Sequence, residues 1–590
     1  MSVVVGLNFH HADSSACVLV DGELKAAIAE ERLGPRIKHD PSFPGRALGA
    51  VLHEAGVTVD DITHVALPRD PSANLKAKVS YVASHPVSGG LAAIEHLRRR
   101  EQAKSLKQQI ADELGCDLER LHFDEVPVEH HLSHISSAYY CSPFEELTAG
   151  FSYDASGDFV SLMAARCEGS RINVLDRVPL PSSLGFFYTA LCQFIGFDGF
   201  GEEYKVMGLA PYGRDLHQPL MEEMVRLDKD GWFSLDGRFF GMHNGGTSGL
   251  LDNDGHVVMG TFYSSALQER LGPPRRRDQP ITQREMDIAR SCQVRFQRVA
   301  LHCINQLHRR LPTPRIAYAG GCALNGVANS LFLRESPFDS PYLQCASSDD
   351  GTSLGAALWA YHNVARGKER FHMKHAYWGR SHTLEACEDA AQSASMPMRS
   401  FGGKAPQAVA ELLHRGMVVA WYQGRSEWGP RALGNRSILA SPLVSDMKDT
   451  INRKIKKRES FRPFAPTVLQ ECVADYFEQT VHSPFMMHVV KVKPEWRERL
   501  PAITHVDGTA RLQSITREVN PNYHDLISAF KERSGVGIVL NTSFNENEPI
   551  IDTPRQAMDC FLRTDLDAIC LNGFVVCKPE HETTLQALDS

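Results

Sequence analysis

The chain has 590 residues and a formal net charge of −8 at pH 7. This length exceeds what one compact core accommodates, so we expect two or more domains. The acidic balance disfavours a nucleic-acid partner, because such binding needs a basic surface. No window approaches the roughly 20 apolar residues of a membrane-spanning helix, and the N-terminus lacks a charged leader region. The 14 cysteines form no CxxC pair, so we expect reduced thiols and a cytoplasmic location without membrane attachment.

Short apolar segments separated by turns open the chain. The segments Ser2–Gly6, Ala16–Val20 and Leu24–Glu30 predict a small antiparallel meander. Helical apolar spacing follows at Ala47–Ala55 and over Val79–Ile110.

A second unit of similar plan begins near the middle of the first half. Leu147–Tyr153 and Phe159–Ala164 predict a strand and its returning partner, with Asp154–Asp158 as the turn. Thr282–Arg310 predicts a long amphipathic helix that begins with a capping box and leads to a strand at Ile316–Ala319. Two such strand-and-glycine units predict a duplicated α/β fold with a cleft between its lobes.

The apolar periodicity weakens around Ala365–Ser381, where polar, basic and aromatic residues mix. We place a domain boundary there and expect one domain over residues 1–372 and a second over 380–590. The second domain is predicted to be α/β as well, with a strand at Val418–Trp421.

Three turns of the first domain carry polar or glycine-rich sequences. They are Asn8–Ser15, which contains His10 and His11, then Asp154–Asp158, and then Gly320–Gly326, which follows a strand and opens a helix. Histidines in a turn can hold a general base or face a phosphate, and helix starts offer unpaired amides to anions. In this order, the three turns resemble the layout of the actin-like ATPase superfamily.

Histidines cluster in Glu129-His130-His131-Leu132-Ser133-His134. His130 and His134 share one face of a helix and can bind one metal ion. His131 stands where the HExxH zinc-protease motif has its catalytic Glu, so that motif does not apply. Two imidazoles with carboxylates from other turns, for which Asp154 and Asp349 are the candidates, suit iron, manganese or zinc.

The stretch from Tyr422 to Leu469 is rich in cations set among glycine and proline. The cationic residues are Arg425, Arg431, Arg436, Arg453, Lys454, Lys456, Lys457, Arg458 and Arg462. Converging cations on a rigid loop predict a site for a phosphate- or carboxylate-bearing small molecule, with a structural salt-bridge cluster as the alternative. Two later segments join it: His505–Arg511, predicted to be a polar turn presenting Arg511, and Leu540–Asn545, predicted to end a strand.

Several segments resemble the O-carbamoyltransferases that modify nodulation factors, antibiotics and other natural products. The matching segments are Glu30–His39, His130–His134, Glu202–Gly213, Gly320–Gly326, Ser347–Ala357, Gly429–Leu439, Lys456–Pro466, His505–Gln513 and Leu540–Asn545. The resemblance implies a duplicated-lobe, actin-like (ASKHA, Kae-type) N-terminal domain and a C-terminal YrdC-like α/β domain. It also implies that the YrdC-like domain forms carbamoyl adenylate from carbamoyl phosphate and ATP. The carbamoyl group then passes to a hydroxyl group of a small-molecule acceptor in the actin-like domain.

The same resemblance assigns roles to residues and cofactors. The implied metal ligands are His130, His134, Asp154 and Asp349, with iron(II) (Fe²⁺) as the expected ion and Mg²⁺ expected with ATP. The implied cofactor-binding residues of the first domain are Asn8, Gly157, Gly320, Gly321 and Asn325. Lys38 and Lys205 are implied as charges near the phosphate or the acceptor. The residues implied to bind carbamoyl phosphate and ATP in the second domain are Arg431, Lys456, Arg462, Arg511, Asn541 and Ser543.

His11 is our candidate for the general base on the acceptor hydroxyl group, because an imidazole can accept that proton at neutral pH. The family's common pattern has the histidine directly before Asp. This chain has His10-His11-Ala12-Asp13, so His10 is an alternative base and the role of Asp13 stays open.

Two other functions share parts of this pattern. A threonylcarbamoyl-type tRNA-modifying transferase shares both domain types, although the acidic chain lacks the basic stripe that tRNA docking needs. An actin-like metabolite kinase would release ADP rather than pyrophosphate and AMP. The sequence leaves the acceptor, its pocket and the oligomeric state open, and a homodimer is one option.

Overall fold

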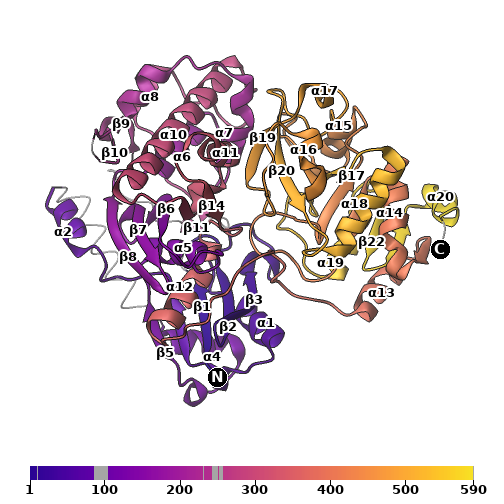
Figure 1. Ribbon diagram of the computed structural model, residues 1–590, viewed down its shortest axis with the longest axis horizontal. Coiled ribbons are helices and arrows are strands. Elements are labelled where there is room, and N and C mark those ends of the chain that lie inside the picture. Colours follow the sequence, from indigo (N-terminus) through magenta and orange to yellow (C-terminus); the bar gives the residue numbers. More distant parts are fainter. Residues whose placement is uncertain (10, 85–103, 230, 242–249, 252–256, 589–590) are drawn as a thin grey trace. The chain divides into compact units, whose positions relative to one another are not determined.

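The computed structural model describes residues 1–9, 11–84, 104–229, 231–241, 250–251 and 257–588. Over these residues the chain divides into two compact units, Met1–Met373 and Lys374–Ser590. In Figure 1 the first unit runs from indigo to pink and the second from orange to yellow.

The first lobe of the first unit is built on a five-stranded sheet of order β3-β2-β1-β4-β5. Its strands are β1 (Val3–Asn8), β2 (Ser15–Val20), β3 (Glu23–Ala29), β4 (His64–Leu67) and β5 (Asp124–Pro127). The β1–β2 and β2–β3 pairs are antiparallel, which confirms the predicted meander, whereas β1–β4 and β4–β5 are parallel.

Strand β1 is buried on both faces, which explains its continuous apolar sequence. Val3 and Val5 belong to the same core as Leu48 of helix α1 (Gly45–Ala55). Gly6 points the other way, where an added Cβ would lie 2.0 Å from the carbonyl oxygen of Ser353. Ser353 belongs to helix α12 (Asp350–Asn363), so only glycine allows this helix to approach the strand so closely.

The second lobe repeats the plan in a sheet of order β14-β13-β6-β7-β8. Its strands are β6 (Thr148–Gly157), β7 (Val160–Glu168), β8 (Arg171–Pro179), β13 (Arg315–Ala319) and β14 (Ser340–Leu343). Again two pairs are antiparallel and two are parallel. The repeated strand order and pairing confirm the duplicated-lobe, actin-like fold expected from the sequence.

Helices surround these sheets (Figure 1). They are α2 (Leu75–Ser84), α4 (Leu106–Leu114), α5 (His130–Tyr139), α6 (Leu184–Phe194), α7 (Glu203–Leu209), α8 (Gln218–Met224), α9 (Ser265–Leu271), α10 (Gln283–Arg310) and α11 (Gly326–Glu335). Short hairpins add β9 (Val225–Leu227), β10 (Phe233–Leu235), β11 (Leu250–Leu251) and β12 (Val257–Val258). The predicted capping box of α10 is confirmed, since Glu285 Oε2 accepts hydrogen bonds from Thr282 N at 2.9 Å and from Thr282 Oγ1 at 2.6 Å.

Two further sequence predictions can be compared with the observed elements. The helical region predicted over Val79–Ile110 is represented by α2 and α4, and residues 85–103 lie outside the described part of the chain. The predicted turn Asp154–Asp158 is wrong in extent, because strand β6 continues to Gly157 after a register shift. The turn itself consists of Asp158 and Phe159, which both have positive φ angles (47° and 69°).

The second unit contains a nine-stranded sheet of order β15-β23-β22-β16-β17-β21-β18-β20-β19. The strands are β15 (Met398–Ser400), β16 (Val419–Tyr422), β17 (Arg436–Ala440), β18 (Ala465–Leu469), β19 (His488–Lys491), β20 (Thr509–Ile515), β21 (Ile538–Ser543), β22 (Ala568–Leu571) and β23 (Phe574–Cys577). Arg511 therefore lies in a strand and not in the predicted turn.

Helices complete the second unit and confirm it as a mixed α/β domain (Figure 1). They are α13 (Leu384–Gln392), α14 (Ala405–His414), α15 (Met447–Ile451), α16 (Val473–Tyr476), α17 (Pro494–Arg497), α18 (Pro521–Ser534), α19 (Pro554–Arg563) and α20 (Glu582–Gln586). Helices α14 and α18 pack against each other. In the part of the chain that the structure describes, no helix combines the length and apolarity needed to cross a bilayer.

Candidate active sites

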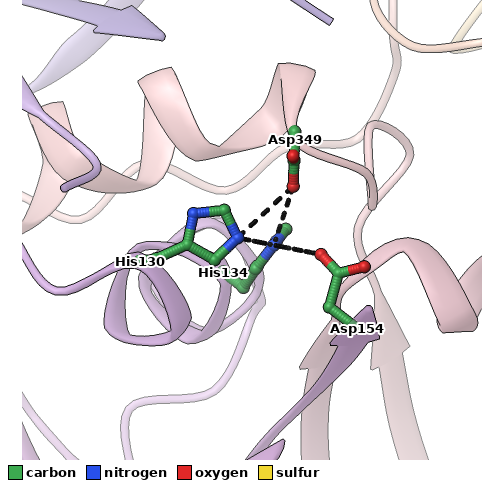
Figure 2. Close-up of side chains that lie close together, drawn as sticks. All are labelled: His130, His134, Asp154 and Asp349. Carbon is green, nitrogen blue, oxygen red and sulfur yellow. Dashed lines mark hydrogen bonds and ion pairs between the residues drawn. The ribbon is translucent and has the colours of Figure 1, made fainter. Parts of the chain in front are cut away.

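Four buried or half-buried side chains converge in the first unit (Figure 2). His130 and His134 lie on α5, Asp154 on β6, and Asp349 directly before α12. One nitrogen or oxygen atom from each of the four lies within 4.8 Å of the others. His134 Nε2 is 2.9 Å from Asp154 Oδ2, His130 Nε2 is 3.1 Å from His134 Nε2, and His130 Nε2 is 3.3 Å from Asp349 Oδ1.

This donor set fits a divalent metal ion. Both imidazole Nε2 atoms point to the same place, and Asp349 Oδ1 is buried without a hydrogen-bond partner. Burial and the negative charge of Asp349 oppose ionisation of Asp154, yet the hydrogen bonds from both histidines lower its pKa to about 2. Two imidazoles with two ionised carboxylates suit iron(II), manganese or zinc.

Two neighbouring residues hold this cluster in place. His131 hydrogen-bonds Ser152 Oγ through Nδ1 (2.8 Å) and the Val160 carbonyl oxygen through Nε2 (2.9 Å). Burial, followed by repulsion from the two adjacent histidines, lowers the pKa of His131 to about 3, so this ring is neutral. At Gly157 an added Cβ would lie 1.9 Å from the His130 ring, so the glycine leaves room for that imidazole.

His11 lies beside this cluster. Its Nδ1 is 3.0 Å from Asp349 Oδ2 and 3.2 Å from the Ala12 carbonyl oxygen. His10 lies outside the described residues. Asn8 is buried and its Nδ2 donates a 2.9 Å hydrogen bond to the Asp13 carbonyl oxygen, so it shapes the turn that carries His11.

The structure adds a residue that the sequence analysis missed. His39 Nδ1 lies 2.6 Å from Asp13 Oδ1, and Ser348 Oγ donates to Asp13 Oδ2 at 3.1 Å. Burial lowers the pKa of His39, but the charge and hydrogen bond of Asp13 raise it to about 9. The sequence feature that could have indicated His39 is its position directly after Lys38, an exposed residue of the same turn. The Lys205 ammonium group pairs with Glu202 Oε1 at 2.6 Å.

The glycine-rich turn passes over Asp154. An added Cβ at Gly320 would lie 2.1 Å from the Tyr153 carbonyl oxygen, and at Gly321 2.8 Å from Asp154 Oδ1. Asn325 caps α11 by accepting a 3.1 Å hydrogen bond from Ala328 N. The structure thus brings the glycine pair next to the histidine–aspartate cluster.

A second cluster lies in the other unit and consists of guanidinium groups. Burial, and then the positive charges of Arg431, Arg458 and Arg462, lower the pKa of Arg511 well below its usual range. Arg511 Nε is buried without a hydrogen-bond partner, and Arg462 lies 3.6 Å from Glu459. The positive charges of these four arginines repel one another, and a bound anion would offset that repulsion.

Other cations of the basic stretch have structural roles. Arg436 is fully buried, donates to the carbonyl oxygens of Gln423 (2.6 Å) and Gly424 (3.1 Å), and covers the Tyr422 ring. Arg425 donates to the backbone of Gly379 and Trp378. These two arginines therefore have a structural role, as the alternative expected, but the contacts described are hydrogen bonds to backbone carbonyl oxygens and not a salt-bridge cluster.

Lys456 and Ser543 meet at the end of β21. Lys456 Nζ donates to the carbonyl oxygens of Ser543 (2.6 Å) and Asn545 (2.7 Å) and to Asn545 Oδ1 (2.6 Å). These three contacts match the three protons of an ammonium group. In this arrangement Lys456 shapes the loop that carries Ser543.

The loop that carries Arg431 is fixed from both sides. Glu427 Oε1 accepts hydrogen bonds from the backbone nitrogens of Leu433 (2.7 Å) and Asn435 (2.8 Å). From the sheet, Asn541 Nδ2 donates to the Ala432 carbonyl oxygen at 3.2 Å, and Gln513 Nε2 donates to that of Leu433 at 2.9 Å. Glu427 and Gln513 were not predicted from the sequence, although Gln513 ends one segment of the family resemblance and Glu427 lies two residues before another.

Comparison with known proteins gives matches over most of the chain. The family model described as Carbamoyltransferase N-terminus matches residues 3–358, and that described as Carbamoyltransferase C-terminus matches residues 410–578. Nodulation protein NolNO of Sinorhizobium fredii (strain NBRC 101917 / NGR234) is 36% identical over 582 residues, which cover 96% of this chain and 79% of that protein.

Two further relatives have names of the same kind. Nodulation protein NolO of Bradyrhizobium diazoefficiens is 39% identical over 463 residues, 76% of this chain and 79% of that protein. The 3'-hydroxymethylcephem-O-carbamoyltransferase of Amycolatopsis lactamdurans is 37% identical over 229 residues, 39% of this chain and 42% of that enzyme. Among solved structures, component A of (R)-2-hydroxyglutaryl-CoA dehydratase from Acidaminococcus fermentans is 12% identical with a TM-score of 0.31 over 62% of this chain and 100% of that one, which adds nothing to the topology.

Proposed function

The chain belongs to the carbamoyltransferase family, and we propose that it makes carbamoyl adenylate from carbamoyl phosphate and ATP and transfers the carbamoyl group to a hydroxyl group of a small natural product. The enzyme is a carbamoyltransferase. The adenylate intermediate, the acceptor class and the residue roles below are the proposal.

The observation that carries the proposal is the arginine cluster of the second unit. Arg511 is half-buried, the positive charges of Arg431, Arg458 and Arg462 act on it, and its buried Nε has no hydrogen-bond partner. Guanidinium groups bind phosphate oxygens in two-pronged hydrogen bonds, and reactions at phosphorus depend mainly on positioning and neutralisation of charge. Carbamoyl phosphate and the triphosphate of ATP are anions of the class that this cluster would hold, with Mg²⁺ accompanying ATP.

The proposed reaction has three steps, two in the second unit and one in the first. Water cleaves carbamoyl phosphate to carbamate and phosphate, and a carbamate oxygen then attacks the α-phosphorus of ATP, so that pyrophosphate leaves and carbamoyl adenylate forms. In the first unit the acceptor oxygen attacks the carbamoyl carbon, the bond from that carbon to the AMP oxygen breaks, and AMP leaves. The acceptor hydroxyl group loses its proton to a base.

We assign the role of that base to His11. With Nδ1–H donated to Asp349 Oδ2 at 3.0 Å, the imidazole is held in one orientation and its Nε2 is left to accept the proton. His130, His134, Asp154 and Asp349 would hold the metal ion, for which we propose iron(II). When bound, such an ion supplies a Lewis acid.

The names of the relatives support a small-molecule acceptor. One relative is named as an O-carbamoyltransferase of a hydroxymethylcephem, and two others are nodulation proteins. We therefore propose a hydroxylated natural product as the acceptor, without a nucleic-acid partner, and a cytoplasmic site of action.

Mass spectrometry after incubation with ATP, carbamoyl phosphate and a panel of hydroxylated natural products tests the proposal. The expected result is an acceptor that gains the mass of one carbamoyl group, together with AMP and pyrophosphate. Formation of ADP alone would instead support a kinase, and tight, salt-sensitive retention of bulk tRNA on filters would support the tRNA-modifying alternative.

A further inference from the structure

The second unit begins with a segment that is hydrogen-bonded to the loop carrying Arg431. We call residues 374–380, which directly follow the first unit, the linker segment, and residues 423–435 the Arg431 loop. The backbone nitrogen of Trp428 donates to the Ala376 carbonyl oxygen at 2.6 Å. Trp428 is 1% exposed and stands three residues before Arg431, so this bond ties the linker segment to the loop close to that arginine.

A glycine allows the two stretches to touch. Gly379 N donates to the Ser426 carbonyl oxygen at 2.9 Å, and an added Cβ at Gly379 would lie 2.0 Å from Ser426 Oγ. Arg425 Nε donates to the Gly379 carbonyl oxygen at 2.7 Å, and Arg425 Nη2 donates to that of Trp378 at 2.9 Å. A larger residue at position 379 would therefore push the linker segment away from the loop.

Tyr377 connects the linker segment to the part of the loop that follows Arg431. Its hydroxyl group donates to the Leu433 carbonyl oxygen at 2.9 Å and accepts a hydrogen bond from Asn520 Nδ2 at 3.0 Å. Burial raises the pKa of Tyr377 above its usual range, so the hydroxyl group keeps the proton that it donates. The linker segment thus holds the loop both before and after Arg431.

The linker segment itself sets the direction of the Tyr377 side chain. The His375 ring stacks on Tyr377 (centroids 5.5 Å apart, 19° between planes) and on Trp378 (4.7 Å, 21°). His375 Nδ1 accepts a hydrogen bond from Tyr377 N at 3.2 Å, and Trp378 Nε1 donates to the His375 carbonyl oxygen at 2.8 Å. Burial, followed by the positive charge of Arg425, lowers the pKa of His375, which favours the neutral ring that an accepting Nδ1 requires.

We propose that Tyr377 is a positioning residue for donor binding in the second unit. Through the Leu433 carbonyl group it holds the Arg431 loop in the conformation in which Arg431 binds the phosphate group of carbamoyl phosphate. In this role Tyr377 touches no substrate and acts only through Arg431. The inference rests on the proposed function of the second unit.

Loss of the hydroxyl group should loosen the loop without unfolding the unit. In Tyr377→Phe, the Leu433 carbonyl oxygen keeps the hydrogen bond from Gln513 Nε2 at 2.9 Å, and Asn520 Nδ2 keeps its bond to Asn435 Oδ1 at 2.9 Å. Neither group is left unpaired, so the large cost of an unsatisfied buried polar group does not arise. The loop would adopt the binding conformation for only part of the time, which lowers the apparent affinity by that fraction and retains turnover at saturation.

The test uses the full chain and measures pyrophosphate release at saturating ATP and Mg²⁺ over a range of carbamoyl phosphate concentrations. For Tyr377→Phe we expect the KM for carbamoyl phosphate to rise at least about fivefold, with kcat within about twofold of the wild type. A merely structural effect would lower the amount of active enzyme, which lowers kcat and leaves KM unchanged. An unchanged KM, with or without a lower kcat, overturns the inference.

A double-mutant cycle shows whether Tyr377 acts through Arg431. Without the guanidinium group that it positions, Tyr377 has nothing to contribute to donor binding. In the Arg431→Ala background, assayed at a higher enzyme concentration, Tyr377→Phe should therefore change the KM by less than about twofold. An equal rise of the KM in both backgrounds would show that Tyr377 acts independently of Arg431 and would overturn the inference.

Tyr476→Phe is the matched control. Tyr476 is 2% exposed, and its hydroxyl group accepts a 2.8 Å hydrogen bond from the backbone nitrogen of Gly537, which lies outside the Arg431 loop. We expect this variant to keep the wild-type KM. A rise as large as that of Tyr377→Phe would contradict the assignment to Tyr377.

If Tyr377→Phe does not fold, Gly379→Ala takes its place in the same assays. Its added methyl group meets Ser426 Oγ and displaces the linker segment from the loop, so the KM for carbamoyl phosphate should again rise. An unchanged KM in this variant would then overturn the inference.

The outcomes distinguish this inference from the proposed function. A wild-type enzyme that releases pyrophosphate with carbamoyl phosphate, combined with a wild-type KM in Tyr377→Phe, overturns the inference alone. A wild-type enzyme that never releases pyrophosphate with carbamoyl phosphate overturns the proposed function and this inference with it.

Discussion

Individual residues of one chemical type have different roles in this protein, and their surroundings decide which. Arg436 donates hydrogen bonds to backbone carbonyl groups within the core. The positive charge of Arg431, five positions earlier, instead contributes to lowering the pKa of Arg511. Arg453 of the same basic stretch is exposed. These three arginines therefore allow the proposed donor site to be tested with matched variants.

Replacement of Arg431, which is half-buried, by Ala should reduce carbamoyl-phosphate-dependent pyrophosphate release by at least about a hundredfold, because a charged contact to phosphate is lost. Bound metal in the first unit should not change. Arg453→Ala is the matched control, and we expect it to retain wild-type activity. Wild-type turnover in Arg431→Ala would remove this residue from the donor site.

Replacement of His11 by Ala should slow carbamoyl transfer to the acceptor by about 10²–10⁴-fold, the usual contribution of a general base. Pyrophosphate release without acceptor should persist, since His11 belongs to the first unit. Separate assays of pyrophosphate and carbamoylated product check this expectation. An unaffected transfer rate would place the base elsewhere.

At the scale of elements, strand β19 contains a titratable group in the core. His488 is 8% exposed, and its Nδ1 lies 3.0 Å from Ser483 Oγ. Burial, followed by the charge of His482, lowers its pKa from 6.5 to about 4. The folded state therefore binds its proton less readily than the unfolded state does.

The free energy of unfolding of the second unit should consequently be highest above pH 6.5 and fall as the pH drops from 6.5 towards 4. One such group contributes a slope of at most about 1.4 kcal/mol per pH unit. In urea unfolding at several pH values, His488→Asn should show a smaller slope in this range. His414→Asn, at an exposed position on α14, should keep the wild-type slope; equal slopes in all three proteins would contradict the assignment.

The sequence predicted elements well where local pattern determines them. The opening meander and the capping box of α10 follow from alternation and from side chains three residues apart. The helical spacing of His130 and His134 likewise brought both imidazoles to one face. What the sequence analysis missed depends on contacts between distant segments, such as Asp13 with His39, 26 residues later.

Arg511 illustrates the same limit. Its neighbours His505–Arg511 are polar and include Gly508, so the sequence favoured a turn, but pairing with β18 and β19 makes a strand from Thr509 onward. The sequence shows that the stretch is rich in cations. Which of these cations are buried in the core and which surround Arg511 depends on the side of each strand or loop that faces the core, and that side is set by contacts between distant segments.

At the scale of the whole molecule, two compact units carry two separate candidate sites. The histidine–aspartate cluster lies in Met1–Met373 and the arginine cluster in Lys374–Ser590. We therefore expect removal of the metal ion to affect carbamoyl transfer in the first unit but not formation of carbamoyl adenylate in the second.

Removal of the divalent metal ion from the first unit with a chelator, followed by addition of Mg²⁺ alone, should abolish carbamoyl transfer and leave pyrophosphate release. Both reactions can be followed in one sample, and iron(II) should restore transfer. His130→Ala, assayed for bound metal by elemental analysis, should reproduce the chelated state. Full metal content in that variant would exclude His130 as a ligand.

The most direct test of the account is a chemical one, made without any acceptor. The enzyme, incubated with ATP, Mg²⁺ and carbamoyl phosphate, is quenched, and its nucleotides are separated and identified by mass spectrometry. The account predicts carbamoyl adenylate, or AMP from its hydrolysis, in amounts equal to the pyrophosphate and phosphate released. Intact ATP with unconsumed carbamoyl phosphate, or ADP as the nucleotide product, would contradict it.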